Sequence, residues 1–257
     1  GGAGLMAEQE RKEELAAWDT VIIVTYHLPI QLKREEDGAY IVEWDDDRGL
    51  HKDGINLVCR CIYVGCIDLE ITDAVEQQVI EKLLLEKYSC VVLFLDPTLK
   101  AAYYHGFCRG YLSPIMHNQM QIARGSNPFQ QEQWMAYCSV NQLFATKVLS
   151  VYSDGFMVWV HDYHLMLLPS IILRKRRTAK VGFFLHTPFP ASDVWRSTAV
   201  RIELLRGLLN ADLIGFLLFE YARNFLACCK RMLGLEYEFE KGGSLGVEYE
   251  GRHVGLQ

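Results

Sequence analysis

Two histidines, an aspartate and a tyrosine follow one apolar run of this sequence. The run at 158–160 leads directly into His161, Asp162, Tyr163 and His164. Polar groups of this kind are expensive to bury unless each has a hydrogen-bond partner. Three interpretations fit these residue types: a metal site, a structural network of satisfied polar groups, or a polar lip that binds sugar hydroxyls.

A second motif follows the apolar run at 181–185. His186 begins the sequence His-Thr-Pro-Phe-Pro, whose two prolines make the chain rigid and fix where the histidine points. A zinc site needs three or four ligands, and only His186 could join His161 and His164. A metal-dependent hydrolase built on these three histidines is therefore the weakest of the candidate functions.

These residues need a scaffold, and the sequence predicts a parallel sheet with helices on both faces. Apolar and β-branched runs predict strands at 21–24, 58–64, 91–95, 157–160, 181–185 and 212–216. Helices are predicted at 73–88, 165–177, 201–209 and 219–233. Their alternation is typical of an α/β, Rossmann-like fold.

Two further expectations come from this pattern. In the predicted helix 73–88, the buried stripe is expected to contain Val75, Val79, Leu83 and Leu84. Ligands of such sheets bind beyond the carboxyl ends of the strands. That rule selects the segments 25–30, 161–164 and 186–190.

Composition limits the function. The chain has 257 residues, is 50% hydrophobic and carries a formal net charge of -6, so we expect no nucleic-acid partner. The most apolar stretch, 165–173, is too short to span a membrane, and the N-terminus does not resemble a signal peptide. The eight cysteines form no Cys-x-x-Cys pair, which predicts reduced thiols in a cytoplasmic protein.

Two longer motifs point to a family. The run His-Asp-Tyr-His-Leu-(x)3-Pro at 161–169 and the run Gly-Phe-Phe-Leu-His-Thr-Pro-Phe-Pro at 182–190 resemble the trehalose-6-phosphate synthase family. Tyr-Tyr-His-Gly-Phe at 103–107 and the segment 203–216 support the same resemblance. The similarity extends over 21–257 and is strongest to the plant-like branch, whose members often carry an altered active site.

The resemblance implies a fold and a reaction. It implies the N-terminal half of a GT-B glycosyltransferase, which transfers glucose from UDP-glucose to glucose 6-phosphate with retention of anomeric configuration and without a cofactor. We expect 1–17 to be a disordered or tag-derived leader and 18–257 to be the acceptor-side domain. The C-terminal domain that binds the nucleotide sugar is expected to be absent from the chain.

The resemblance also implies roles for single residues. Asp162 and His186 are the implied catalytic residues, the first bound to hydroxyls of the acceptor sugar and the second to the donor glucose. No metal ligand is implied. The implied substrate-binding residues are Tyr104, which would line the acceptor phosphate pocket, and His27, Tyr63, Arg48 and His161.

The sequence departs from the family pattern where the acceptor phosphate should bind. His27 replaces the Arg of an Arg-Leu-Pro motif, Tyr63 replaces the Trp of Trp-x-Gly, and Ser113 replaces a second Trp. The glycine-rich loop is reduced to Arg48-Gly49-Leu50. Arginine is always charged and grips phosphate bidentately, whereas histidine is mostly neutral near pH 7. Arg48 or Arg109 would have to supply the missing cation.

Two functions are consistent with these residues. The first is the acceptor-side domain of a glucosyltransferase that makes trehalose 6-phosphate, inactive alone because a catalytic cleft needs both walls. The second is a regulatory domain that has lost the acceptor site. The expected partners are glucose 6-phosphate, UDP-glucose, the C-terminal domain, and further copies or other synthase subunits. The sequence does not decide which residues or domains come after residue 257, a phosphatase domain among them.

Overall fold

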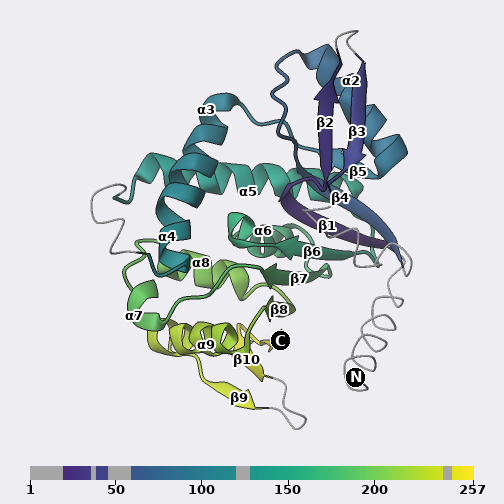
Figure 1. The fold of residues 1–257 in the computed structure, drawn as a ribbon. Coiled ribbons are helices and arrows are strands. Elements are labelled where there is room, and N and C mark those ends of the chain that lie inside the picture. The colour runs from purple at the N-terminus through teal and green to yellow at the C-terminus, as the bar shows by residue number, and fades with distance from the viewer. Residues whose placement is uncertain (1–19, 36–38, 46–58, 120–127, 240–244) are drawn as a thin grey trace, which may run out of the picture. The chain divides into compact units, whose positions relative to one another are not determined.

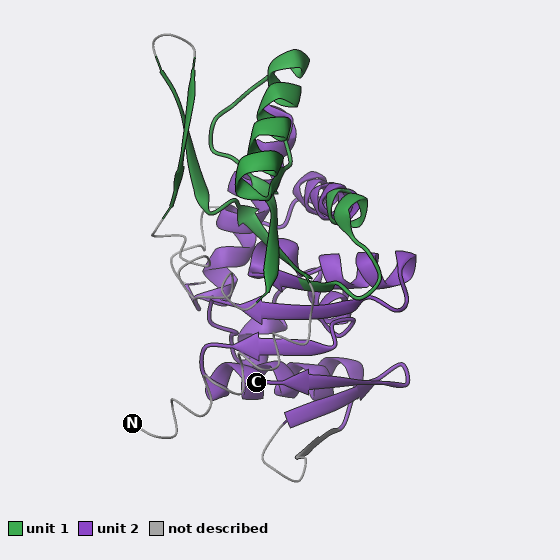
Figure 2. Cartoon of the chain, turned by 90° about the vertical axis from the view of Figure 1, so that its right-hand side faces the viewer, with its two compact units in different colours: residues 1–95, 147–158 green, residues 96–146, 159–257 purple. Residues whose placement is uncertain are grey.

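The structure, a computed structural model, describes residues 20–35, 39–45, 59–119, 128–239 and 245–257. The chain divides into two compact units, residues 1–95 with 147–158 and residues 96–146 with 159–257 (Figure 2). The expected leader, 1–17, lies outside the described residues. A single domain over 18–257 stays a prediction.

The first unit contains three parallel strands and a long helix (Figure 1). The strands adjoin in the order β5-β4-β1, with bounds β1 Thr20–His27, β4 Arg60–Cys66 and β5 Cys90–Val92. Residues 21–24 of β1 are fully buried, as a β-branched run in a parallel sheet requires. Helix α2, Ala74–Tyr88, connects β4 to β5, and the Asp73 carboxylate caps it by accepting a hydrogen bond from the Glu76 N–H at 2.8 Å.

A β-hairpin that the sequence pattern did not predict lies between β1 and β4 in the chain. It pairs β2, Ile30–Arg34, with β3, Tyr40–Trp44, as a separate antiparallel sheet. The Tyr88 hydroxyl, at the end of α2, donates a hydrogen bond to the Val42 carbonyl at 3.1 Å. The hairpin is therefore anchored on α2 within the same unit.

The buried face of α2 is not the predicted one. Val75 and Val79 are 69% and 58% exposed, whereas Ile80 and Leu84 are fully buried. The prediction was right for Leu84 and wrong for the two valines. Successive residues of a helix are about 100° apart, so stripes that start at Val79 and at Ile80 face different directions. Apolar spacing alone offers both stripes, and only the packing partner decides between them.

The second unit begins with a helical region that the sequence pattern also left unassigned. Its elements are α3 (Pro97–Lys100), a π-helix (Ala101–Leu112), α4 (Ser113–Met116) and α5 (Gln131–Val151), whose last residues belong to the first unit. The buried side chains of α5 include an apolar series spaced at three and four residues, Tyr137, Val140, Phe144 and Val148, and one polar residue, Asn141.

The sheet of the second unit is mixed. Its strands adjoin in the order β6-β7-β8-β11-β10-β9, with bounds β6 Met157–His161, β7 Lys180–Leu185, β8 Leu213–Phe216, β11 Arg252–Leu256, β10 Leu245–Tyr249 and β9 Tyr237–Phe239. β8 is parallel to β7 and to β11, whereas β10 is antiparallel to both of its neighbours. The helices between the strands are α6 (Leu168–Lys175), α7 (Ser192–Trp195), α8 (Arg201–Leu208) and α9 (Phe219–Leu233).

Helix α8 approaches the chain before α6 closely at one glycine. A Cβ atom at Gly207 would lie 2.4 Å from the carbonyl oxygen of Met166, which is a severe overlap. Only glycine lets the two segments meet without displacing that carbonyl.

These elements confirm the predicted α/β class, with a mostly parallel sheet and helices between its strands. The antiparallel pairs of β9, β10 and β11 are a difference from an all-parallel sheet. All eight cysteines are free thiols. None of the helices that the structure describes is long and apolar enough to cross a membrane.

The corrected face of α2 predicts a contrast between two neighbouring residues. Ile80→Ala should lower the free energy of unfolding by about 2–5 kcal/mol, because it leaves a cavity in a fully buried site. Val79→Ala should change it by less than about 0.5 kcal/mol. Urea denaturation of both variants measures the difference, and similar losses for the two variants would contradict this assignment.

Candidate functional site

Three of the predicted site residues lie together at the carboxyl ends of two neighbouring strands. His161 is the last residue of β6, Asp162 follows it, and His186 follows β7. The Asp162 N–H donates to the Phe184 carbonyl at 2.8 Å, which continues the contact of the two strands. This is the edge at which ligands of parallel sheets bind.

The backbone of Asp162 adopts a conformation that is rare for any residue other than glycine. Its φ of 68° and ψ of 168° lie in a region that costs a residue with a side chain about 1–3 kcal/mol. Strained backbone of this kind is concentrated at functional sites, where the surroundings hold it in place. The conformation gives the Asp162 side chain a direction that ordinary extended backbone would not give.

The carboxylate of Asp162 is held by donors from two segments. It accepts hydrogen bonds from the backbone N–H groups of Tyr163 and His186, and from the Thr187 hydroxyl at 3.3 Å. Burial raises the pKa of the Asp162 carboxyl above its ordinary value, while these donors and the nearby His186 act in the opposite direction. The result is a fixed acceptor with little freedom to rotate.

His161 and His186 form a direct pair. Nδ1 of His161 lies 2.9 Å from Nε2 of His186, so one ring donates a hydrogen bond and the other accepts it. The rings are stacked at an interplanar angle of 25°. Burial, followed by the proximity of His186, lowers the pKa of His161 well below its ordinary value. His161 is therefore a neutral ring that supports His186, whose side chain is exposed.

Tyr104 belongs to the same cluster through His164. The two rings stack at a centroid distance of 5.7 Å, and Nδ1 of His164 lies 3.9 Å from Oδ2 of Asp162. The guanidinium carbon of Arg109 lies 5.8 Å from the centroid of the Tyr104 ring. The second unit thus brings an exposed cation, an aromatic ring and a fixed carboxylate into one neighbourhood.

The remaining predicted residues are elsewhere. His27 ends β1 in the first unit, where its Nδ1 lies 3.0 Å from Oδ1 of Asp68. Tyr63, in β4, is only 2% exposed and packs edge-to-face against Trp44 at a centroid distance of 5.7 Å. Arg48 lies outside the described residues. Substrate contacts by these three residues stay predictions.

Sequence reasoning missed several members of the cluster. Thr187 and the aromatic role of His164 were not singled out, although both stand inside the two predicted motifs. Asn141 is fully buried in α5, and a polar residue within the apolar spacing of that segment was the signal that could have drawn attention to it. No group of three or more His, Cys, Asp or Glu that could hold a metal ion occurs among the described residues.

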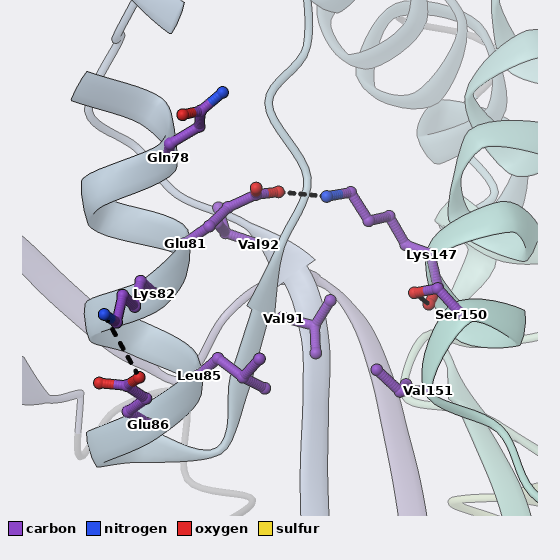
Figure 3. Close-up of a pocket in the computed structure, with 10 residues that line it drawn as sticks. All are labelled: Gln78, Glu81, Lys82, Leu85, Glu86, Val91, Val92, Lys147, Ser150 and Val151. Carbon is purple, nitrogen blue, oxygen red and sulfur yellow. Dashed lines mark hydrogen bonds and ion pairs between the residues drawn. The ribbon is translucent and has the colours of Figure 1, made fainter. Parts of the chain in front are cut away.

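The first unit also contains a hollow of about 490 Å³ between α2, β5 and the end of α5 (Figure 3). Its floor is apolar, with Val91 and Leu85, and an ion pair between Glu81 and Lys147 crosses it from helix to helix. None of the predicted site residues lines this hollow. It is separate from the cluster around Asp162.

Comparison with known proteins assigns the family. The sequence profile of glycosyltransferase family 20 matches residues 19–257, which is nearly the whole chain. The chain belongs to glycosyltransferase family 20. An Arabidopsis thaliana relative, alpha,alpha-trehalose-phosphate synthase [UDP-forming] 5, is 46% identical over 243 residues, which cover 93% of this chain but only 28% of that protein.

Solved structures agree on the fold of this family 20 chain. The N-terminal domain of Candida albicans trehalose-6-phosphate phosphatase matches with a TM-score of 0.74 and 25% identity, over 93% of this chain and 47% of that one. A Burkholderia xenovorans alpha,alpha-trehalose-phosphate synthase (UDP-forming), solved in complex with glucose-6-phosphate, matches with a TM-score of 0.70 and 20% identity, over 93% of this chain and 49% of that one. The chain therefore spans about half of each structure, and it has the fold of the N-terminal half of a GT-B glycosyltransferase.

The lowered pKa of His161 predicts a dependence of stability on pH. Below pH 6.5, the ordinary pKa of histidine, His161 binds a proton in the unfolded chain but not in the folded one. The free energy of unfolding therefore falls as the pH decreases. His161→Asn removes this contribution, which amounts to at most about 1.4 kcal/mol per pH unit.

Urea denaturation at pH 7.0 and 5.5 measures this loss. The variant should lose less stability than the wild type over this interval. His117→Asn, at an exposed position at the end of α4, is the control and should follow the wild type. Parallel pH curves for wild type and His161→Asn would show that folding does not lower the pKa of His161.

Proposed function

We propose that this chain is the acceptor-side domain of a retaining glucosyltransferase that transfers glucose from UDP-glucose to glucose 6-phosphate. In this proposal Asp162 binds hydroxyls of the acceptor sugar, and His186 reaches the donor glucose. The observation that carries the proposal is the fixed, strained carboxylate of Asp162 beside an exposed His186 at the ligand-binding edge of the sheet.

The chemistry of the cluster suits a sugar. Sugar hydroxyls both donate and accept hydrogen bonds, so a carboxylate and an imidazole together can satisfy them. His186 is hydrogen-bonded to His161 through Nε2, and its exposed side chain can be reached by a ligand. No covalent nucleophile is needed if developing charge is stabilised by fixed dipoles and by cations of a second domain.

Recognition of the phosphate group is assigned to Arg109. Its exposed guanidinium lies beside Tyr104, and a guanidinium binds phosphate bidentately. Because His27 is engaged with Asp68, that histidine is a poorer phosphate ligand than the arginine of the family pattern. Arg109 would thus take over a role that the family pattern places at the end of β1.

The donor half of the reaction rests on the relatives. The Arabidopsis relative is named a UDP-forming synthase, and this chain covers 28% of its length. Binding of UDP-glucose by a C-terminal domain is therefore part of the proposal. A cytoplasmic location stays a prediction from the cysteine spacing, and association with further copies or other synthase subunits stays a prediction from the resemblance.

The second candidate is a regulatory domain without transferase activity. The pairing of His27 with Asp68 and the burial of Tyr63 favour it, because both reduce what the first unit offers to a phosphate. One structural neighbour is named as the N-terminal domain of a phosphatase, so a domain of this fold also occurs in a protein that is not named a synthase.

Calorimetry with glucose 6-phosphate tests the acceptor site. The 257-residue chain should bind the ligand with a sub-millimolar Kd, and Asp162→Ala should weaken binding by about 10- to 150-fold, the loss of a hydrogen bond to a charged group. Asp193→Ala, which removes an exposed carboxylate paired with Arg231, should bind like the wild type. Absence of binding by the wild type would favour the regulatory candidate, and unchanged binding by Asp162→Ala would refute the assigned role of Asp162.

Assay of UDP release tests the need for a second domain. With UDP-glucose and glucose 6-phosphate, the chain alone should release no UDP above the uncatalysed background, because it supplies one wall of the cleft. A full-length family member provides the positive control. Turnover by the chain at rates typical of enzymes, about 1–1000 per second, would overturn this expectation.

A further inference from the structure

The short helical turn after Asp162 is held by buried side chains from α5. The Tyr137 hydroxyl donates a hydrogen bond to the Tyr163 carbonyl at 2.8 Å and accepts one from the Met166 N–H at 3.0 Å. One hydroxyl therefore grips both ends of the turn Tyr163–Leu165. The turn itself closes on Asp162, whose carbonyl accepts from the Leu165 N–H at 3.2 Å.

Two more side chains hold the middle of the same turn. The carbonyl of His164 accepts hydrogen bonds from the Tyr103 hydroxyl at 2.9 Å and from the Asn141 amide at 3.2 Å. Asn141 also donates to the carbonyl of Tyr137, one helical turn earlier in α5. The turn is therefore bonded to side chains on two different helices.

These side chains cannot move aside. Tyr103, Tyr137 and Asn141 are all fully buried. The Tyr137 ring packs against Phe107 at a centroid distance of 4.6 Å and against Trp134 at 5.6 Å. Burial raises the pKa of Tyr137 well above its ordinary value, so its hydroxyl keeps the proton that it donates.

The position of this clamp, formed by Tyr137, Tyr103 and Asn141, accounts for the backbone conformation of Asp162. A residue with φ of 68° and ψ of 168° relaxes towards an allowed region unless the chain on both sides is fixed. On the N-terminal side the Asp162 N–H is bonded to Phe184 of β7. On the C-terminal side only the turn 163–166 can resist relaxation, and its carbonyls are held by the clamp.

We propose that Tyr137 is a positioning residue for Asp162, whose hydroxyl locks the 163–166 turn and thereby keeps the carboxylate in the strained orientation that meets the ligand. Tyr103 and Asn141 assist through the His164 carbonyl. The structural part of this inference stands independently of the ligand. The part that concerns ligand affinity rests on the proposed binding of a sugar by Asp162.

Two substitutions at Asp162 measure the strain. Asp162→Ala and Asp162→Gly both remove the carboxylate, but only glycine adopts this backbone conformation freely. The glycine variant should therefore melt about 2–6 °C above the alanine variant. The greater freedom of glycine in the unfolded chain lowers this Tm difference by the same amount in every background. A change of the Tm difference between two backgrounds therefore measures a change of the strain at position 162.

The same pair is then compared in the Tyr137→Phe background. Removing the hydroxyl should let the turn relax, so the Tm difference between glycine and alanine should fall to less than half of its wild-type value. Tyr111→Phe is the matched control, because that hydroxyl accepts a backbone N–H, from Ala199 at 2.8 Å, in the same aromatic cluster without touching the turn. It should leave the difference unchanged. An undiminished difference in Tyr137→Phe refutes the proposal.

Tyr103→Phe keeps the experiment decisive if Tyr137→Phe does not fold. It releases one of two donors to the His164 carbonyl, so it should reduce the same Tm difference partially. A full wild-type difference in this variant would contradict the clamp.

Ligand affinity separates this inference from the proposed function. Tyr137→Phe should weaken binding of glucose 6-phosphate about ten-fold, whereas Tyr111→Phe should bind like the wild type. If the strain measurement responds and the wild type binds no glucose 6-phosphate, the positioning role stands and the proposed ligand is wrong. If the ligand binds and Tyr137→Phe changes neither the strain nor the affinity, the positioning role is wrong.

Discussion

The backbone of Asp162 constrains everything else at this site. A residue with a side chain occupies a conformation that suits glycine, at the point where β6 ends. That arrangement persists only because both neighbouring segments are fixed, one by the edge of β7 and the other by side chains of α5 and the π-helix. The carboxylate gains a direction and three donors in return. The buried side chains of α5 and the edge of β7 therefore act together on the conformation of one residue.

The histidines of the two units lie in different electrostatic environments. The second unit keeps an uncharged imidazole, His161, behind an exposed one, His186, so the pair offers a hydrogen-bonding ring without a buried positive charge. In the first unit, His27 faces a carboxylate. This family 20 chain thus keeps a hydrogen-bonded histidine pair at the ends of β6 and β7 and carries, at the end of β1, a histidine beside Asp68.

Six strands of the sheet were predictable from the sequence, because an apolar, β-branched run such as 21–24 favours a fully buried strand, whereas β9, β10 and β11 were not predicted. The helix at 74–88 was predictable but its buried face was not, since Val79 and Ile80 are equally apolar and only the packing partner chooses between them. The carboxyl-end rule selected the segments that contain His161, Asp162 and His186, and the family resemblance alone pointed to Tyr104. The φ of Asp162 and the hydrogen bonds of Tyr137 could not be foreseen, since both depend on a helix that carries no recognisable motif.

The glycine of α8 has a consequence for how variation in this chain should be interpreted. Any side chain at position 207 would displace the Met166 carbonyl and with it the segment that begins at Asp162. A substitution at Gly207 would therefore act on the position of Asp162 through the backbone between residues 162 and 166. In this fold an invariant residue would indicate a close backbone contact as readily as a residue that binds a ligand.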